Sequence, residues 1–278
     1  MDDVMHKTLF LISLALSSAA CSDADAYREK TGVAQAAAPA QQGAPAPDAS
    51  EARPFALTDN DQKDGGAREY SYSWPGEVSR EPGLVRQFKA RIAEDLASQK
   101  QDWLSALADC PADAVSCRNN SLSVEWKVVA DLQRFLSLSS NMAAYTGGAH
   151  GNYGRSAMIW DREAGKSFDP KDMFDLAALE KATASARCRM LNAQRAKRRG
   201  AQVPEGSSEW SEDCPDMESV ILFVGSSSRK AFDRLGFYYG PYVAGAYAEG
   251  DYEVDLPVNA AILAAVKPPY RAAFSAKR

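Results

Sequence analysis

Histidine is the scarcest chemistry-bearing residue of this sequence, with 2 among 278 residues. Only His150 lies beyond residue 20, so a zinc site built from two or three histidines has no ligands in the rest of the chain. A G-x-S-x-G elbow is also absent, and the nearby Ser156 lacks the strained turn that exposes a nucleophile. We therefore expect a protein that is not an enzyme, with no catalytic residue, no metal and no cofactor. A hydrolase would have to use His150.

An excess of positive charge is missing as well. Lys and Arg number 32 against 37 Asp and Glu, which gives a formal net charge of -5. This balance argues against a protein that binds nucleic acid. The one basic stretch lies between Cys188 and Cys214, and an acidic stretch follows it there. A bridge between the two cysteines would fold the acidic half back onto the basic half, so we expect the charges to neutralise each other. Contact of the basic half with anionic lipid or lipopolysaccharide is the alternative.

The apolar run near the amino terminus, Leu9 to Leu16, is too short to span a bilayer. His6 and Lys7 precede it, and small residues lead from it into Cys21, which is the layout of a cleavable export signal. A cysteine at this place resembles the lipobox of bacterial lipoproteins. The resemblance implies cleavage before Cys21 and lipid on its thiol. An ordinary signal peptide in which Cys21 is incidental is the alternative.

Either Met1 or Met5 is the first residue of the leader, because Asp2 and Asp3 fit poorly in a positively charged segment. Ser22 follows the lipidated position. In the lipoprotein sorting rule that this leader resembles, only Asp at that position strongly favours the inner membrane. The resemblance therefore implies a lipid anchor in the outer membrane, with the domain facing the periplasm.

Residues 21–66 are rich in Ala, Pro, Gln and Gly and contain few large apolar side chains. Such a segment cannot offset its ordering entropy by burial, so we expect a disordered stalk. A flexible coil of this length spans roughly 35 to 40 Å. The predicted organisation is a signal peptide over 1–20, a stalk over 21–66 and one folded domain over 67–278.

Four further cysteines, an even number, lie in the predicted domain, and an oxidising compartment favours disulfides over metal ligation. Three pairings are possible, of which local pairing is the simplest. It joins Cys110 to Cys117 and Cys188 to Cys214. A zinc site made of the same four thiols is disfavoured because their spacing lacks paired C-x-x-C units.

The apolar periodicity predicts an α+β domain with a mostly antiparallel sheet and helices packed on one face. Apolar residues at helical spacing predict a long helix over 84–107 and a second helix near 175–199. Alternation predicts strands, and a short helix closes the domain. The predicted strands are 122–128, 134–140, 156–160, 219–224, 231–238 and 252–256, and the predicted closing helix is 258–266.

Four blocks, in their order along the chain, carry a more specific resemblance: SLSVEWKVVAD, RFLSLSSNMAAYTGGAHGNYG, KSFDPKDMF and FYYGPYVAGAYAEGDYEVDLP. They resemble the family of envelope domains that includes the anti-sigma factor RsiV and the accessory module of the deacetylase PdaC. The resemblance covers about residues 68–266, and the GGAHGN block is its most distinctive part. In RsiV it implies a receptor for lysozyme, and in PdaC a module beside a separate catalytic domain. Because this chain shows no anti-sigma segment, spanning helix or attached deacetylase, we expect neither sigma-factor control nor catalysis to carry over.

The GGAHGN block has two interpretations. Its glycines permit positive φ angles, so the block bends the chain between two strands while His150 bonds a neighbouring carbonyl. Alternatively, the block is a polar loop that contacts a partner, with pH dependence added by His150. The candidate binding residues of this loop are Tyr145, Thr146, His150, Asn152 and Tyr153.

The aromatic run over 237–252 is equally open to two interpretations. Core packing accounts for at least half of its rings, whereas exposed tyrosines near glycine stack on sugars or anchor a protein partner. Tyr239 and Tyr242 lie on either side of the Gly240 and Pro241 turn. We expect these two tyrosines to be exposed contacts.

Two functional hypotheses follow. The first is a non-catalytic lipoprotein that binds a protein such as a lysozyme-like muramidase, because a mildly acidic surface attracts a cationic enzyme. The second is a module that binds peptidoglycan directly and tethers or senses the cell wall. We expect no nucleic-acid partner, and contact with the membrane through the lipid on Cys21 only.

Overall fold

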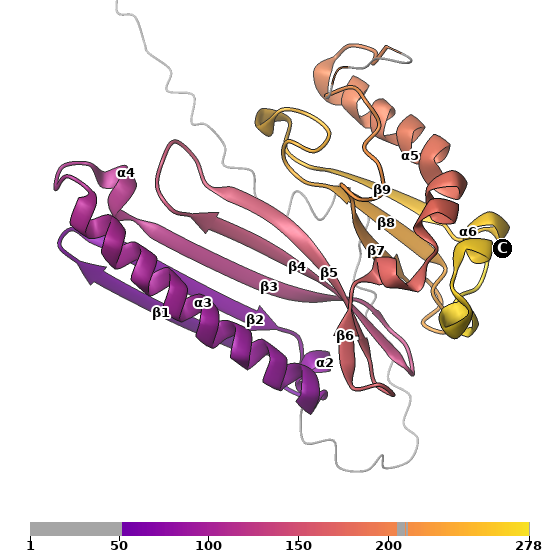
Figure 1. Ribbon diagram of the computed structural model, residues 1–278, viewed down its shortest axis with the longest axis horizontal. Coiled ribbons are helices and arrows are strands. Elements are labelled where there is room, and N and C mark those ends of the chain that lie inside the picture. Colours follow the sequence, from indigo (N-terminus) through magenta and orange to yellow (C-terminus); the bar gives the residue numbers. More distant parts are fainter. Residues whose placement is uncertain (1–51, 205–208, 210, 278) are drawn as a thin grey trace, which may run out of the picture. The chain divides into compact units, whose positions relative to one another are not determined.

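The strands of the folded unit form two sheets (Figure 1). Neighbouring strands run antiparallel except for β2 and β3, which are parallel. The predicted α+β class is confirmed, but the strands divide between two sheets. The first sheet has the order β1 (Phe55–Lys63), β2 (Gly66–Trp74), β3 (Asn120–Asp131), β4 (Phe135–Tyr145), β5 (Asn152–Asp161), β6 (Lys166–Phe168). The second has the order β7 (Ile221–Gly225), β8 (Arg234–Tyr239), β9 (Tyr252–Pro257).

Two long helices accompany the sheets, α3 (Pro82–Asp109) and α5 (Leu176–Arg199), which confirms both predicted long helices. Pro82 lies in the first turn of α3, and Gly200 ends α5 in the left-handed conformation. No helix in the described ranges combines the length and apolarity needed to cross a bilayer. The shorter helices are α2 (Gly76–Ser79), α4 (Val115–Arg118), α6 (Ala260–Ala265), η1 (Pro170–Met173), η2 (Tyr247–Glu249) and η3 (Pro268–Ala273).

The computed structural model describes residues 52–204, 209 and 211–277. The predicted signal peptide, Cys21 and the stalk as far as residue 51 lie outside these residues. The boundary predicted at residue 66 is wrong, because strand β1 begins at Phe55 and belongs to the first sheet. Asp64 and Gly65, at φ 51° and 76°, form a two-residue turn that pairs β1 with β2. The ring of Phe55 stacks on Trp74 at 3.8 Å, which anchors the start of β1.

Helix α3 packs on the first sheet through one apolar stripe. Leu84, Phe88 and Ile92 are buried on this stripe, and Phe88 stacks on Trp126 of β3 with ring centroids 4.8 Å apart. The helix contacts β2 and β3 and, near its start, β6. Because one helix is about 10 Å wide, it cannot cover a sheet of this width. Part of the face over β4 and β5 therefore stays open.

Side chains of β4 and β5 alternate between two cores. Leu136 and Trp160 join the core beneath α3, whereas Phe135 and Ile159 join the core that contains the second sheet. Strand β7 contacts β3, β4 and β5. The second sheet thus packs on the face of the first sheet opposite α3.

Both predicted disulfides are present, Cys110–Cys117 and Cys188–Cys214, with Cα separations of 5.9 and 5.5 Å. The first closes the turn that contains α4, and the second joins α5 to the segment before β7. Each bridge therefore ties a helix to a connecting segment beside it.

Candidate functional site

The loop between β4 and β5 bends as the glycine block suggested. Gly147 and Gly148 have φ angles of 101° and 95°, which favour glycine. Tyr145 donates its hydroxyl hydrogen to the carbonyls of Ser116 and Gly148, each at 2.9 Å. A Cβ on Gly147 would lie 3.2 Å from the Ser116 oxygen, so the loop packs closely on the turn closed by Cys110–Cys117. Tyr145 is therefore a support of the loop.

His150 is exposed and stacks on Tyr247 of η2, with ring centroids 4.0 Å apart and an angle of 23°. Its Nδ1 lies 2.8 Å from the Gly151 carbonyl oxygen, to which Tyr247 also donates at 2.6 Å. Tyr153 contacts Tyr247 edge-on at 5.9 Å, and Tyr242 lies 5.5 Å from it. His150, Tyr153, Tyr242 and Tyr247 form what we call the aromatic cluster. Loops of both sheets contribute to it.

The aromatic cluster presents several rings to solvent. Tyr242 is 55% exposed and Tyr153 is 38% exposed, while Tyr247 lies half-buried between them and His150. Exposed tyrosines held by neighbouring rings lose little conformational entropy when a partner binds. This arrangement is therefore suited to binding a protein surface or a sugar ring.

Tyr239 does not belong to the aromatic cluster, and the expectation of its exposure is wrong. It lies on β8, the middle strand of the second sheet, and is fully buried. Its hydroxyl accepts a hydrogen bond from Arg187 at 3.1 Å, and burial raises its pKa. The Tyr239 side chain packs in the core that α5 forms with the second sheet, and a position next to a turn did not reveal this packing.

Tyr242 has a backbone conformation that tyrosine rarely adopts, with a φ of 67°. The amide of Val243 donates to the Gly240 carbonyl at 3.0 Å, so residues 240–243 form a β-turn with Pro241 at its second position. A positive φ at the third position is typical of a type II turn and favours glycine there. A tyrosine in this place costs about 1 kcal/mol or more. The sequence thus keeps a large exposed ring at a strained position.

Arg195 of α5 holds the segment that follows this turn. Its guanidinium is buried and donates to the Ala244 carbonyl at 2.8 Å. It also donates to the carbonyls of Glu212 and Asp213, both at 2.9 Å, close to Cys214. Arg195 therefore bonds backbone oxygens of the other half of the Cys188–Cys214 segment. The sequence predicted that basic side chains of this segment pair with its acidic side chains. The hydrogen bonds of Arg195 to the acidic half instead go to backbone carbonyls.

Glu249 holds η2 and with it Tyr247. It accepts hydrogen bonds from Arg199 at 2.8 Å and from the Tyr252 hydroxyl at 2.5 Å, and from the Ala246 amide at 3.1 Å. Burial opposes ionisation of the carboxyl group, but these hydrogen bonds together lower its pKa. Glu249 is thus an ionised support of the loop at neutral pH.

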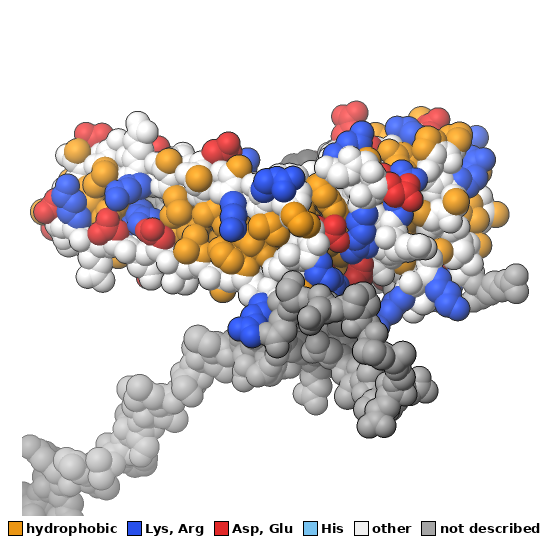
Figure 2. Space-filling view, turned by 90° about the horizontal axis from the view of Figure 1, so that it is seen from below, with side chains coloured by type: hydrophobic (Ala, Val, Ile, Leu, Met, Phe, Trp, Pro, Cys, Tyr) orange, Lys and Arg blue, Asp and Glu red, His pale blue; other side chains and the backbone are white. Residues whose placement is uncertain are grey.

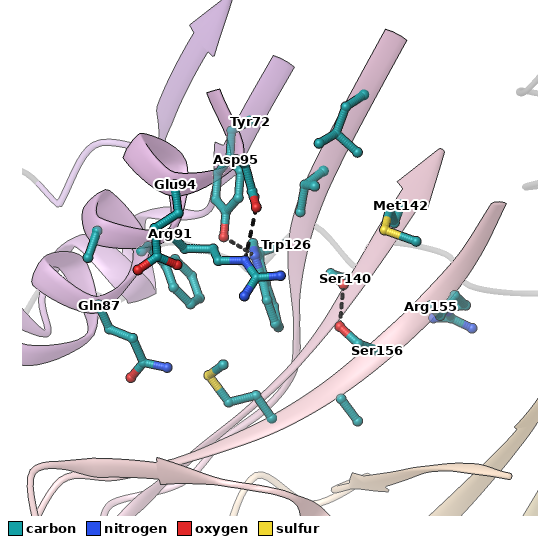
Figure 3. A pocket seen from close by; sticks show the side chains of 16 residues that line it. Tyr72, Gln87, Arg91, Glu94, Asp95, Trp126, Ser140, Met142, Arg155 and Ser156 are labelled. Atoms are coloured by element: carbon teal, nitrogen blue, oxygen red, sulfur yellow. Dashed lines mark hydrogen bonds and ion pairs between the residues drawn. The ribbon is translucent and has the colours of Figure 1, made fainter. Parts of the chain in front are cut away.

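A groove of about 640 Å³ opens beside α3 over β3, β4 and β5 (Figure 3). Trp126, Met142 and Met158 line its apolar floor, and Met142 is 44% exposed. Arg91 and Asp95 stand on the α3 side, where Arg91 Nε lies 3.1 Å from the carboxylate. Burial raises the pKa of Asp95, although Arg91 opposes this effect. The face seen in Figure 2 also shows an uncovered band of apolar side chains interrupted by Lys and Arg.

Thr146 and Asn152 are exposed at the two ends of the β4–β5 loop, but no described contact joins them to the aromatic cluster. Tyr247 is the member of the cluster that was not among the candidates. The alternation of glycines and tyrosines over 245–252 is the sequence pattern that could have indicated Tyr247 as a candidate. Among the described residues, no group of three or more His, Cys, Asp or Glu side chains is placed to hold a metal ion.

Residues 62–153 match the family model described as deacetylase PdaC. The match includes the GGAHGN block and ends within β5, whereas the resemblance noted in the sequence was expected to extend to about residue 266. The two loops of the aromatic cluster therefore divide between the matched segment, which holds His150 and Tyr153, and the rest of the chain. No curated protein matches this chain.

The solved structures that are similar to this chain include two members of the DUF3298 family. One is a DUF3298 family protein from Pseudomonas aeruginosa, with 17% sequence identity and a TM-score of 0.49, covering 81% of this chain and 97% of that chain. The other is a DUF3298 family member from Bacteroides fragilis, with 16% identity and a TM-score of 0.45, covering 74% of this chain and 90% of that one.

Proposed function

We propose that this chain is a non-catalytic binding protein of the bacterial envelope, anchored in the outer membrane by lipid on Cys21 and facing the periplasm. Its aromatic cluster captures a protein ligand such as a lysozyme-like muramidase. The observation that supports this role best is Tyr242, a large exposed ring kept at a strained backbone position. Although the Tyr242 ring packs on Tyr247 at 5.5 Å, more than half of the residue stays exposed, and strain retained at such a site points to a contact with a partner.

The chemistry of the aromatic cluster suits a protein surface. Tyrosines are enriched among the few residues that carry most of the binding free energy at interfaces, because they bury much area with little entropy loss. The chain also carries a net charge of -5, which favours encounter with a cationic protein. Together these features favour a basic muramidase over an acidic ligand.

The test is calorimetric titration of the full chain, with both disulfides formed, against hen-type lysozyme. We expect saturable binding at one site, weakened by salt because the attraction between net charges is screened. Replacing Tyr242→Ala removes an exposed anchor and is expected to weaken binding about tenfold or more. The matched control is Val115→Ala, which removes an equally exposed apolar side chain outside the aromatic cluster.

A flat titration at every salt concentration contradicts a ligand of this lysozyme class. The second candidate function is direct binding of peptidoglycan, favoured by the exposed rings of Tyr242 and Tyr153 on either side of Tyr247, since tyrosine rings also stack on sugars. Pelleting of the chain with purified wall sacculi, reduced by Tyr242→Ala, supports this second function. Pelleting that Tyr242→Ala leaves unchanged contradicts a role of the aromatic cluster in it.

A further inference from the structure

The outer edge of β5 is open over most of its length. Strand β6 pairs with residues 159–161 only, and no strand of the described residues pairs with residues 152–158 on that side. A free edge presents unpaired N–H and C=O groups and is a template for another strand. The open edge begins at the aromatic cluster, which includes Tyr153, and ends at β6.

The hydrogen-bond pattern identifies which groups face outward. The amide of Arg162, just after β5, donates to the Arg134 carbonyl at 2.9 Å. Hydrogen-bonded pairs alternate along an antiparallel ladder, so even-numbered residues of β5 bond β4 in this register. Tyr153, Arg155 and Ala157 therefore direct their N–H and C=O groups away from β4, in line with β6.

Space lies on both sides of this edge. On the α3 side is the groove, into which Met142 and Met158 bring apolar surface. On the opposite side a second hollow of about 250 Å³ extends from β3 over β4 to β5, where Tyr153 and Arg155 line it together with Asp251. An added strand would send alternate side chains to the two sides, one set into each hollow.

The two sides differ in chemistry. The groove floor is apolar, whereas the second hollow lies beside Asp251 and the ion pair of Arg155 with Glu253, whose nearest atoms are 2.5 Å apart. The charged residues that line the second hollow are Glu125, Arg155 and Asp251, so acidic side chains outnumber basic ones in its lining. An occupant that alternates apolar and basic residues complements both sides.

We propose that the open edge of β5 binds an extended segment of a partner protein, with alternating apolar and basic residues, as an added strand of the first sheet. The proposal rests on the proposed role of the chain as a binding protein and specifies how a partner docks. Backbone hydrogen bonds to Arg155 and Ala157 supply affinity, and the two hollows supply specificity.

The opposite edge of the same sheet differs and provides the matched control. The outer strand β1 carries the charged side chains Asp59, Asp61 and Lys63, a pattern that natural sheets use against edge pairing. The two-residue turn at Asp64 and Gly65 makes the odd-numbered residues of β1 bond β2. The amide of Thr58 therefore faces outward from β1 as that of Ala157 does from β5.

The experiment uses the full chain and a synthetic peptide, acetyl-Lys-Val-Lys-Val-Lys-Val-Lys-amide, as the probe. Amide hydrogen exchange followed by mass spectrometry is expected to show peptide-dependent protection over 153–157 and none over 55–63. Ala157→Pro removes an outward donor without breaking the β4 ladder, and we expect it to weaken peptide binding about tenfold. Thr58→Pro places the same substitution at the other edge and is expected to bind as the unmodified chain does.

Absence of peptide-dependent protection over 153–157 overturns the proposal, as does equal peptide affinity of Ala157→Pro and the unmodified chain. The exchange result on the unmodified chain decides the question even if Ala157→Pro loses its fold, which circular dichroism detects. Lysozyme binding without peptide protection leaves the proposed function standing and rejects strand addition. Peptide protection without lysozyme binding rejects that ligand and keeps strand addition.

Discussion

The two long helices that the structure describes, α3 and α5, cover their sheets to different extents. Helix α3 buries one apolar stripe and leaves the groove open over β4 and β5. Helix α5 packs into a closed core with the second sheet, and even its Arg187 and Arg195 are fully buried there. Both halves bury charged side chains, for example Arg68 in the first and Arg187 in the second, but the groove leaves apolar surface without a cover in the first half.

This difference indicates a division of labour. Most residues of the proposed docking edge lie on the first sheet, where unpaired backbone and apolar surface are available to a partner. The second half instead holds Tyr242 and Tyr247 in place through Arg195 and Glu249. We therefore expect the largest losses of stability from changes in the second half, and losses of binding from changes at the open edge of β5 and in the aromatic cluster, to which both halves contribute.

The largest effect is expected at Arg187. Its guanidinium donates to both carboxylate oxygens of Glu180 at 2.7 Å, to the Pro215 carbonyl and to the Tyr239 hydroxyl. Arg187→Ala leaves a cavity and removes the donor from the buried Tyr239 hydroxyl and the Pro215 carbonyl, at a cost of about 3 to 5 kcal/mol. Urea unfolding measures this loss. The exposed Arg189→Ala on the same helix is the control, expected within about 0.5 kcal/mol of the unmodified chain.

The disulfides compare the two halves directly. By the loop-entropy relation, replacing Cys188 and Cys214 by Ser costs about 3.5 kcal/mol, and replacing Cys110 and Cys117 costs about 2.5 kcal/mol, because the first loop is longer. Chemical unfolding of the two double variants gives both numbers. A larger loss for the Cys110 and Cys117 variant would contradict the view that stability is concentrated in the second half.

Acid is expected to weaken the junction between the halves through Asp161 of β5. Burial opposes its ionisation, yet hydrogen bonds from Arg134 at 2.7 Å and from the amides of Glu163 and Ala164 lower its pKa below 3.8. A lowered pKa in the folded state contributes stability at higher pH that is lost as pH falls through it. Stability should therefore fall from about pH 4 downward, and less steeply in Asp161→Asn.

The measurement is the urea midpoint of both proteins over a series of acidic pH values. Parallel pH profiles of Asp161→Asn and the unmodified chain would mean that other carboxyl groups carry the acid response. A flatter profile for the variant would assign part of the acid response to the contact between Asp161 and Arg134. This contact lies at the end of β5, the strand whose side chains enter both cores.

Local patterns were sufficient to predict the elements that depend on neighbours in sequence. The spacing of Leu84, Phe88 and Ile92 predicted α3 because one buried stripe decides a helix. The disulfides paired locally, as the shortest loops suggested. Strand β1 was missed because most of its side chains are exposed and polar, and only the turn at Asp64 and Gly65 marked it.

The aromatic cluster could be predicted only in part, since its contacts join residues far apart in sequence. His150 lies in a loop of the first sheet and Tyr247 in a loop of the second, and nothing in either local pattern indicates that their rings stack. Tyr239 and Tyr242 had the same sequence context, yet one is buried and the other exposed. The packing of α5 on the second sheet decides that difference, because it covers Tyr239 and not Tyr242.

The smallest expected effect is the most informative about Tyr242. Glycine adopts a φ of 67° without strain, so Tyr242→Gly should stabilise the fold by about 1 kcal/mol, whereas Tyr242→Ala keeps the strain and gains nothing. Both variants lose the ring and should bind the lysozyme probe equally weakly. Unfolding and titration of the two variants therefore separate strain from contact. If Tyr242→Gly is instead less stable than the unmodified chain, packing on Tyr247 outweighs the strain, and Tyr242 is retained as a support of the loop.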